Sequence, residues 1–108
     1  MLGSGAIIVM DETADVVAMT RRLAHFYAHE SCGQCTPCRE GTGWLERIMN
    51  RVEAGQGCED DLSVLNDAAV HMAGRTICAL ADGAAAPILS LLKHFPDEVR
   101  ARLMEKAA

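Results

Sequence analysis

Three cysteines occur at three-residue intervals in one short segment of this chain. Cys32, Cys35 and Cys38 form a CxxCxxC motif that reads Cys-Gly-Gln-Cys-Thr-Pro-Cys. This spacing places three thiols on one tight turn, and iron–sulfur clusters are bound by cysteine thiolates in short-spaced runs of this kind. The motif therefore predicts a 4Fe-4S cluster, with three ligands from this segment and a fourth from elsewhere. Two further cysteines, Cys58 and Cys78, are candidates for the fourth ligand.

The elements that would position these thiols are predicted to be helices. Half of the residues are hydrophobic and only 4% are aromatic, and apolar residues recur at helical spacing along most of the chain. The sequence therefore predicts an all-α fold. The expected helices run from about Asp11 to His29, from Thr36 to Gly55, from Asp60 to Gly74, from about Asp82 to Phe95, and, as a short last helix, from Pro96 to Ala108.

Individual residues predict where these helices begin. Asp11 or Thr13 is expected to cap the first helix, and Thr36, followed by a proline, is expected to cap the second. Pro87 lies inside the fourth predicted helix, where it is tolerated best in the first turn. We therefore expect the fourth helix to begin near Ala84.

The expected topology selects the fourth ligand. Short connections favour antiparallel neighbours, so we expect a four-helix up-down bundle with an extended N-terminal arm and a short C-terminal helix. Its first and third connectors lie at the same end, which brings Cys78 to Cys32, Cys35 and Cys38. Cys58 lies at the opposite end, separated by a helix of roughly 25 Å, and is expected to be a free surface thiol without a function.

The first residues differ from the rest of the chain. Residues 1–11 contain a Gly-Ser-Gly turn followed by the run Ala-Ile-Ile-Val-Met, which is typical of a strand, and a lone strand is unstable in water. We therefore expect residues 1–11 to be a remnant strand of a preceding domain, and residues 12–108 to form a helical iron–sulfur cluster-binding domain. The alternative is an extended arm that lies across the bundle.

Composition excludes several other classes of function. The net charge is −5 and no Lys/Arg cluster is present, so we expect no nucleic-acid partner. The longest apolar run is far shorter than the roughly 20 residues that span a bilayer, so we expect no direct membrane insertion. The short-spaced cysteines are typical of a reducing compartment. We therefore expect a cytoplasmic location.

Zinc is the main rival for the cysteines. Four thiolates can form a structural zinc site, but such sites usually combine two well-separated CxxC pairs, whereas this chain has three cysteines plus one. A catalytic thiol would need a base with an orienting partner, and we find no such group beside His29, the histidine nearest to the motif. We therefore expect no catalytic residues in this chain.

The cysteine segments resemble a known family. The run from Glu30 to Gly41, the segment Thr76-Ile77-Cys78-Ala79-Leu80 and the closing Lys93-His94-Phe95 are similar to the C-terminal domain of the NADH-oxidising flavoprotein subunit (51 kDa or F subunit) of NADH:quinone oxidoreductase, respiratory complex I. The resemblance covers essentially the whole chain. It implies a four-helix domain with one 4Fe-4S cluster bound by Cys32, Cys35, Cys38 and Cys78.

The resemblance also implies function and partners. The cluster would take electrons from reduced FMN and pass them to clusters in neighbouring redox subunits, within an NADH dehydrogenase at the cytoplasmic face of the inner membrane. FMN and NADH would bind an upstream domain of the same polypeptide, and not this chain. Alternative parents are NAD-dependent formate dehydrogenases and the diaphorase subunit of NAD-reducing hydrogenases, and the alternative of another class is a zinc-stapled helical interaction domain. The segment from Ala81 to Pro87 departs from the family by lacking a Trp-Pro pair, which affects the packing expected there.

Overall fold

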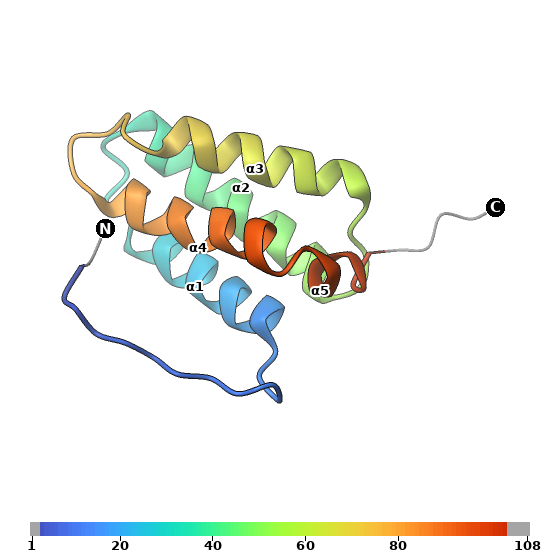
Figure 1. The fold of residues 1–108 in the computed structure, drawn as a ribbon. Helices are drawn as coiled ribbons and strands as arrows, with labels where there is room; N and C mark the ends of the chain where they lie inside the picture. The colour runs from blue at the N-terminus through green and yellow to red at the C-terminus, as the bar shows by residue number, and fades with distance from the viewer. Residues whose placement is uncertain (1–2, 104–108) are drawn as a thin grey trace.

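The computed structural model describes residues 3–103 and is built from helices (Figure 1). Within that range no strand is present, and an isolated parallel bridge pairs Gly57 with Leu103. The prediction of an all-α fold is therefore confirmed. The helices are α1 (Val16–Glu30), α2 (Thr36–Glu53), α3 (Glu59–Met72), α4 (Leu80–His94) and α5 (Pro96–Arg100).

The first four helices form the predicted up-down bundle. Helix α1 packs against α2 and α4, and α3 packs against the other sides of the same two helices. Helix α5 turns back from the end of α4 and also reaches α1 (Figure 1). The last residues of the expected C-terminal helix, 104–108, lie outside the described residues.

The core is aliphatic and extends through the middle of the bundle. Every one of the four long helices contributes, as does the short α5 through Val99. Small residues on α4 allow close approach of its neighbours, because alanine side chains leave little distance between helix axes. The largest fully buried side chains are Leu45, Met49, Leu65, Met72, Ile88, Val17, Val52, Val99 and Thr42.

The predicted start of the first helix is wrong. Helix α1 begins at Val16, since Asp15 accepts a hydrogen bond from the Ala18 N–H at 3.0 Å. Asp11 instead accepts from the Thr13 N–H at 2.9 Å, within a turn that precedes the helix. Both are capping geometries, and the sequence alone did not indicate which one leads into the helix.

Helix α4 begins at Leu80 and not near Ala84, so Pro87 lies in the helix interior. The proline ring removes one backbone donor. The helix nevertheless continues, because its apolar face is buried on both sides of the proline, at Ala84 and Ile88. Tertiary packing outweighs the local preference of proline for a first turn.

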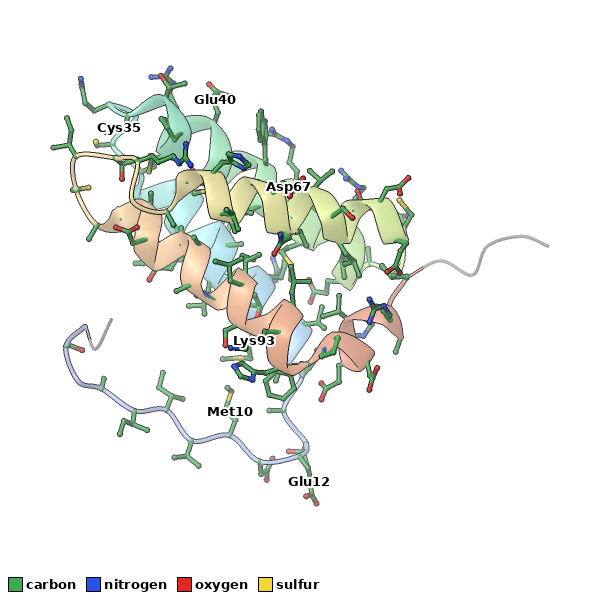
Figure 2. The ribbon with its side chains drawn as sticks, turned by 45° about the horizontal axis from the view of Figure 1, so that its top comes forward. Met10, Glu12, Cys35, Glu40, Asp67 and Lys93 are labelled. Atoms are coloured by element: carbon green, nitrogen blue, oxygen red, sulfur yellow. The ribbon has the colours of Figure 1, made fainter. Side chains whose placement is uncertain are left out.

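The N-terminal segment, from residue 3 to α1, has no helix or strand and runs beside the bundle (Figure 1). Ile7, Ile8 and Val9 are 87%, 78% and 90% exposed. Met10 is more covered and lies on the side toward the end of α4, where Lys93 is found (Figure 2). The division into a remnant strand and a helical domain stays a prediction.

Candidate metal centre

The cysteine-bearing connectors lie at the same end of the bundle. Residues 31–35 connect α1 to α2, and residues 73–79 connect α3 to α4, at the end opposite to the α2–α3 connector (Figure 1). Cys35 lies beside the α3–α4 connector in a second view (Figure 2). The topology thus places Cys32, Cys35, Cys38 and Cys78 at one end.

The motif begins with a sharp turn at the end of α1. The Ser31 N–H donates to the Tyr27 carbonyl at 3.0 Å and ends that helix. Gly33 then has a φ of +83°, a left-handed conformation that glycine adopts without the steric penalty of a side chain. The Ser31 hydroxyl lies 3.3 Å from the Cys38 sulfur. The turn therefore connects two ends of the motif.

Helix α2 begins within the motif. Cys35 is its N-cap, and Thr36 is its first residue, so the predicted cap at Thr36 is wrong by one position. The Thr42 hydroxyl donates to the carbonyl of Cys38, one turn earlier in the helix, at 2.7 Å. Cys38 is consequently part of rigid helix, while Cys32 belongs to the turn.

A hydrogen bond from a backbone N–H to a cysteine sulfur joins the two connectors. The Ile77 N–H donates to the Cys35 sulfur at 3.5 Å, although the two residues are far apart in the sequence. The Thr76 hydroxyl donates to the Cys78 carbonyl at 2.8 Å. Sequence analysis missed Ile77 as a donor, and the available signal was its position directly before Cys78.

The start of the α3–α4 connector is fixed by a glycine and a carboxylate. Gly74, the residue at which the third helix was expected to end, has a φ of +72°, a left-handed conformation. Its N–H donates to the Asp82 carboxylate, in the first turn of α4, at 2.6 Å. The connector is therefore anchored on both sides of Cys78.

The four thiols differ in exposure. Cys38 is 7% exposed, Cys35 is half-buried, and Cys32 and Cys78 are exposed. Within residues 3–103, no three Cys, His, Asp or Glu side chains converge closely enough to hold a metal ion. The assignment of all four as ligands therefore stays a prediction.

The surroundings nevertheless fit a negatively charged iron–sulfur cluster. Helices α2 and α4 both begin at this end, and neither has a side-chain hydrogen bond at its N-cap. Their first N–H groups are thus available to an anion, and the helix dipoles favour one. The donor set of thiols and N–H groups matches what iron–sulfur clusters require.

Cys58 lies at the other end of the bundle, as predicted. It is exposed and serves as the N-cap of α3. Its N–H donates to the Asp61 carboxylate at 3.1 Å, so the residue has a structural place at the helix start. Helix α3 begins at Glu59, one residue earlier than expected.

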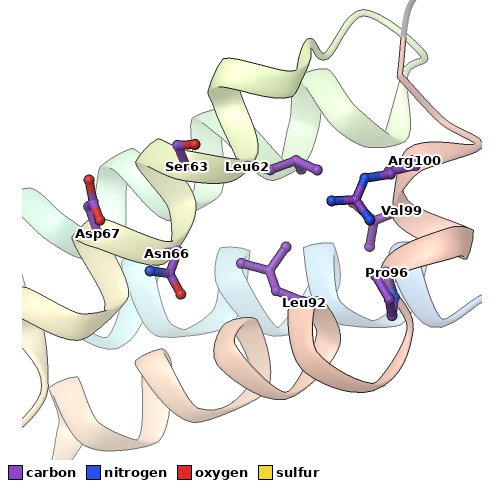
Figure 3. A pocket seen from close by; sticks show the side chains of 8 residues that line it. All are labelled: Leu62, Ser63, Asn66, Asp67, Leu92, Pro96, Val99 and Arg100. Carbon is purple, nitrogen blue, oxygen red and sulfur yellow. The ribbon is translucent and has the colours of Figure 1, made fainter.

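The surface also contains pockets. One lies between α3 and the α4–α5 corner, at the end opposite to the cysteine motif (Figure 3). It combines apolar side chains with Asp67 and Arg100. A smaller, largely apolar pocket between α2 and α3 is lined in part by Trp44 and by Pro37, which belongs to the motif.

The fold and the connectors together define a helical bundle with a cysteine-rich cofactor-binding end. A family model described as NADH-ubiquinone oxidoreductase-F iron-sulfur binding region matches residues 18–102. The chain belongs to this family, which confirms the resemblance found in the sequence. The prediction of a 4Fe-4S cluster as the cofactor is confirmed by the same match.

The names of similar proteins agree with this family assignment. The chain is 52% identical over 106 residues to the mitochondrial NADH-ubiquinone oxidoreductase 51 kDa subunit of Neurospora crassa, covering 98% of this chain and 22% of that protein. It is 50% identical over 103 residues to the F subunit of NADH-quinone oxidoreductase from Mycobacterium bovis, covering 95% and 23%. The chain therefore spans less than a quarter of the length of these relatives.

Solved structures of an NAD+-reducing [NiFe]-hydrogenase contain the same fold. The H2-reduced form gives a TM-score of 0.84 at 36% identity, covering 89% of this chain and 16% of that chain. The air-oxidized form gives a TM-score of 0.85 at 35% identity, covering 93% of this chain and 18% of that chain.

Among the helices within residues 3–103, none combines the length and the hydropathy that a membrane span requires.

Proposed function

We propose that this chain is an electron-transfer module that binds one 4Fe-4S cluster through Cys32, Cys35, Cys38 and Cys78. The observation that carries the proposal is the hydrogen bond from the Ile77 N–H to the Cys35 sulfur, 3.5 Å long. It brings the connector that holds Cys78 against Cys35, which directly precedes the helix that carries Cys38. Such a cluster, when bound, accepts and donates single electrons.

The residues at this end of the bundle would have different roles in binding the cluster. Cys38, on helix α2, supplies a thiolate whose position is fixed by the helix, while Cys32 and Cys78 close the site from the two connectors. The N–H groups at the starts of α2 and α4 would donate to the sulfurs and stabilise the reduced, more negative state. These donors raise the reduction potential relative to a site without them.

The electron donor would be reduced FMN in an upstream domain of the same polypeptide. The acceptors would be clusters in neighbouring redox subunits of an NADH dehydrogenase (quinone). Support comes from the relatives, which are named as subunits of NADH-ubiquinone or NADH-quinone oxidoreductase and are more than four times as long as this chain. The proposed location is the cytoplasmic face of the inner membrane, as a peripheral part of that complex.

A second candidate is the same module in an NAD+-reducing hydrogenase. The fold similarity at a TM-score of 0.84 and 36% identity supports it. Identity of about half to F subunits over nearly the whole chain favours the first candidate. The two proposals share the ligand set and differ in the parent complex.

The test uses the chain purified or reconstituted without oxygen, as wild type, Cys78→Ser and Cys58→Ser. We expect about four iron and four sulfide per chain in the wild type, with a paramagnetic signal on reduction. Cys58→Ser should match the wild type, whereas Cys78→Ser should lose most of the iron and the signal. Wild-type protein that contains one zinc and no sulfide would refute the proposal, as would full cluster content in Cys78→Ser.

A further inference from the structure

The side chain of Arg39 contacts the cysteine motif at two points. Its Nη1 donates to the Gly33 carbonyl at 2.8 Å, and its Nη2 donates to the Thr36 hydroxyl at 3.4 Å. Gly33 lies between Cys32 and Cys35, and Thr36 directly follows Cys35. The guanidinium group therefore spans the part of the motif that contains Cys35.

The first of these bonds fixes a peptide group. Within residues 3–103 no backbone N–H donates to the Gly33 carbonyl, so Arg39 is its donor in the structure. The peptide between Gly33 and Gln34 is trans, because the chain has no cis bonds in this range. In a planar trans peptide the N–H points opposite to the carbonyl. The Gln34 N–H thus points away from the guanidinium group.

The orientation of this peptide would not be secured by glycine alone. Glycine adopts left-handed and right-handed backbone conformations with nearly equal ease, so the φ of +83° at Gly33 needs another interaction to hold it. The Ser31 hydroxyl accepts from the Gly33 N–H at 3.4 Å, a long hydrogen bond. The shorter bond from Arg39 is charge-assisted, and such bonds are about twice as strong as neutral ones.

We propose that Arg39 is a positioning residue for the cluster, acting through the Gly33 carbonyl. By holding that carbonyl, Arg39 keeps the Gln34 N–H available to the sulfurs, and it places a guanidinium group, which also pairs with Glu40 at 3.4 Å, beside the motif. This inference rests on the proposed function. It adds a residue that is not a ligand but sets the retention and the potential of the bound cluster.

The experiment compares Arg39→Met, Arg39→Lys and Arg75→Met with the wild type, all reconstituted without oxygen. Arg75→Met removes the same charge from the α3–α4 connector and is the matched control. Two quantities are measured: the rate of iron loss to a chelator, and the midpoint potential from a redox titration followed by electron paramagnetic resonance. Circular dichroism of each protein verifies that the bundle is folded.

We expect Arg39→Met to lose iron roughly tenfold faster, since a charge-assisted hydrogen bond contributes about 1.5 kcal/mol, and to have a lower potential. Arg39→Lys should bring the potential part of the way back but not the rate, because an ammonium group does not reproduce the planar two-point contact. Arg75→Met should leave the rate at the wild-type value.

Three results would overturn the inference. These are a wild-type rate and potential in Arg39→Met, a changed rate with an unchanged potential in that variant, and equal effects of Arg75→Met and Arg39→Met. A failure of the proposed function is distinct from these, because the wild type itself would then contain no iron and sulfide.

Discussion

Asp61 stabilises the junction between α2 and α3 with a single carboxylate. One of its oxygens accepts from Arg51 at 2.5 Å, and the other accepts from the Cys58 N–H at 3.1 Å. The hydrogen bond from Arg51 is the main reason that the pKa of Asp61 lies below its usual value. The same hydrogen bond raises the pKa of Arg51.

This carboxylate makes stability depend on pH. A pKa that is lower in the folded chain adds stability that is complete above the unfolded value and is lost as the pH falls through the folded value. We expect Asp61→Asn to lower the free energy of unfolding by about 1 kcal/mol at pH 7. At a pH below the lowered pKa of Asp61, the variant and the wild type should converge. Urea unfolding at both pH values measures the difference.

The neighbouring carboxylate provides the control for this prediction. Asp60 is in the same first turn of α3 but is exposed. Asp60→Asn removes the same charge near the helix N-terminus, where the dipole effect amounts to about 0.3–1 kcal/mol. A loss of stability in Asp60→Asn as large as in Asp61→Asn, with the same pH dependence, would contradict the role assigned to the contacts of Asp61.

At the scale of elements, the cysteine-bearing segments are held in place by the packing of α2 against α3. Gly41, on α2, lies against Met72, the last residue of α3, which is 2% exposed. A Cβ at position 41 would lie 2.5 Å from the Met72 sulfur and 2.6 Å from its Cγ. The glycine therefore sets how closely α2, which carries Cys38, approaches the end of α3, just before the connector that carries Cys78.

We expect Gly41→Ala to destabilise the bundle, although alanine favours helices over glycine by about 1 kcal/mol. Overpacking of a buried contact costs about 1–3 kcal/mol, so a net loss of about 1 kcal/mol should appear in thermal or urea unfolding. Gly43→Ala is the control, because its Cβ would meet the flexible side chain of Arg47 at 3.3 Å. That variant should be slightly more stable than the wild type, and equal effects of the two changes would exclude the steric explanation.

The helices and connectors were only partly predictable from the sequence. The helices and the shared end of the two connectors followed from apolar periodicity and from short connections, because both are local properties. The starts of α1 and α4 did not follow, since Asp11 and Asp15 are equally good caps and the burial of Ala84 and Ile88 overrides Pro87. These outcomes depend on packing between distant segments.

The candidate site also combines features that the sequence predicted with features that it did not. The spacing of the motif indicated a thiol-rich turn, and the bundle topology placed Cys78 at its end. The contacts that organise the site come from elsewhere: the Ile77 N–H on the Cys35 sulfur and the Arg39 bond to the Gly33 carbonyl. Apart from the position of Ile77 directly before Cys78, no residue type or spacing indicates these contacts, because they depend on the conformations of two irregular connectors.

At the scale of the whole molecule, the bundle and the N-terminal segment contribute unequally to stability. The residues Ile7, Ile8 and Val9 are at least 78% exposed and bury little apolar surface. Asp15, by contrast, caps α1 and forms an ion pair with Arg102, which lies beyond α5. The boundary of the stable unit is therefore expected near Asp15, rather than at the start of the exposed run.

Removal of residues 1–10 should therefore leave the free energy of unfolding within about 0.5 kcal/mol of the wild type, since surface changes away from structural contacts have effects of this size. Asp15→Ala, in the full chain, should lower it by about 1 kcal/mol through loss of the cap. Urea unfolding of both variants measures the contrast. A large loss of stability on truncation would mean that the exposed run packs on the bundle in solution, whereas the expected result places the independent folding unit in the helices alone.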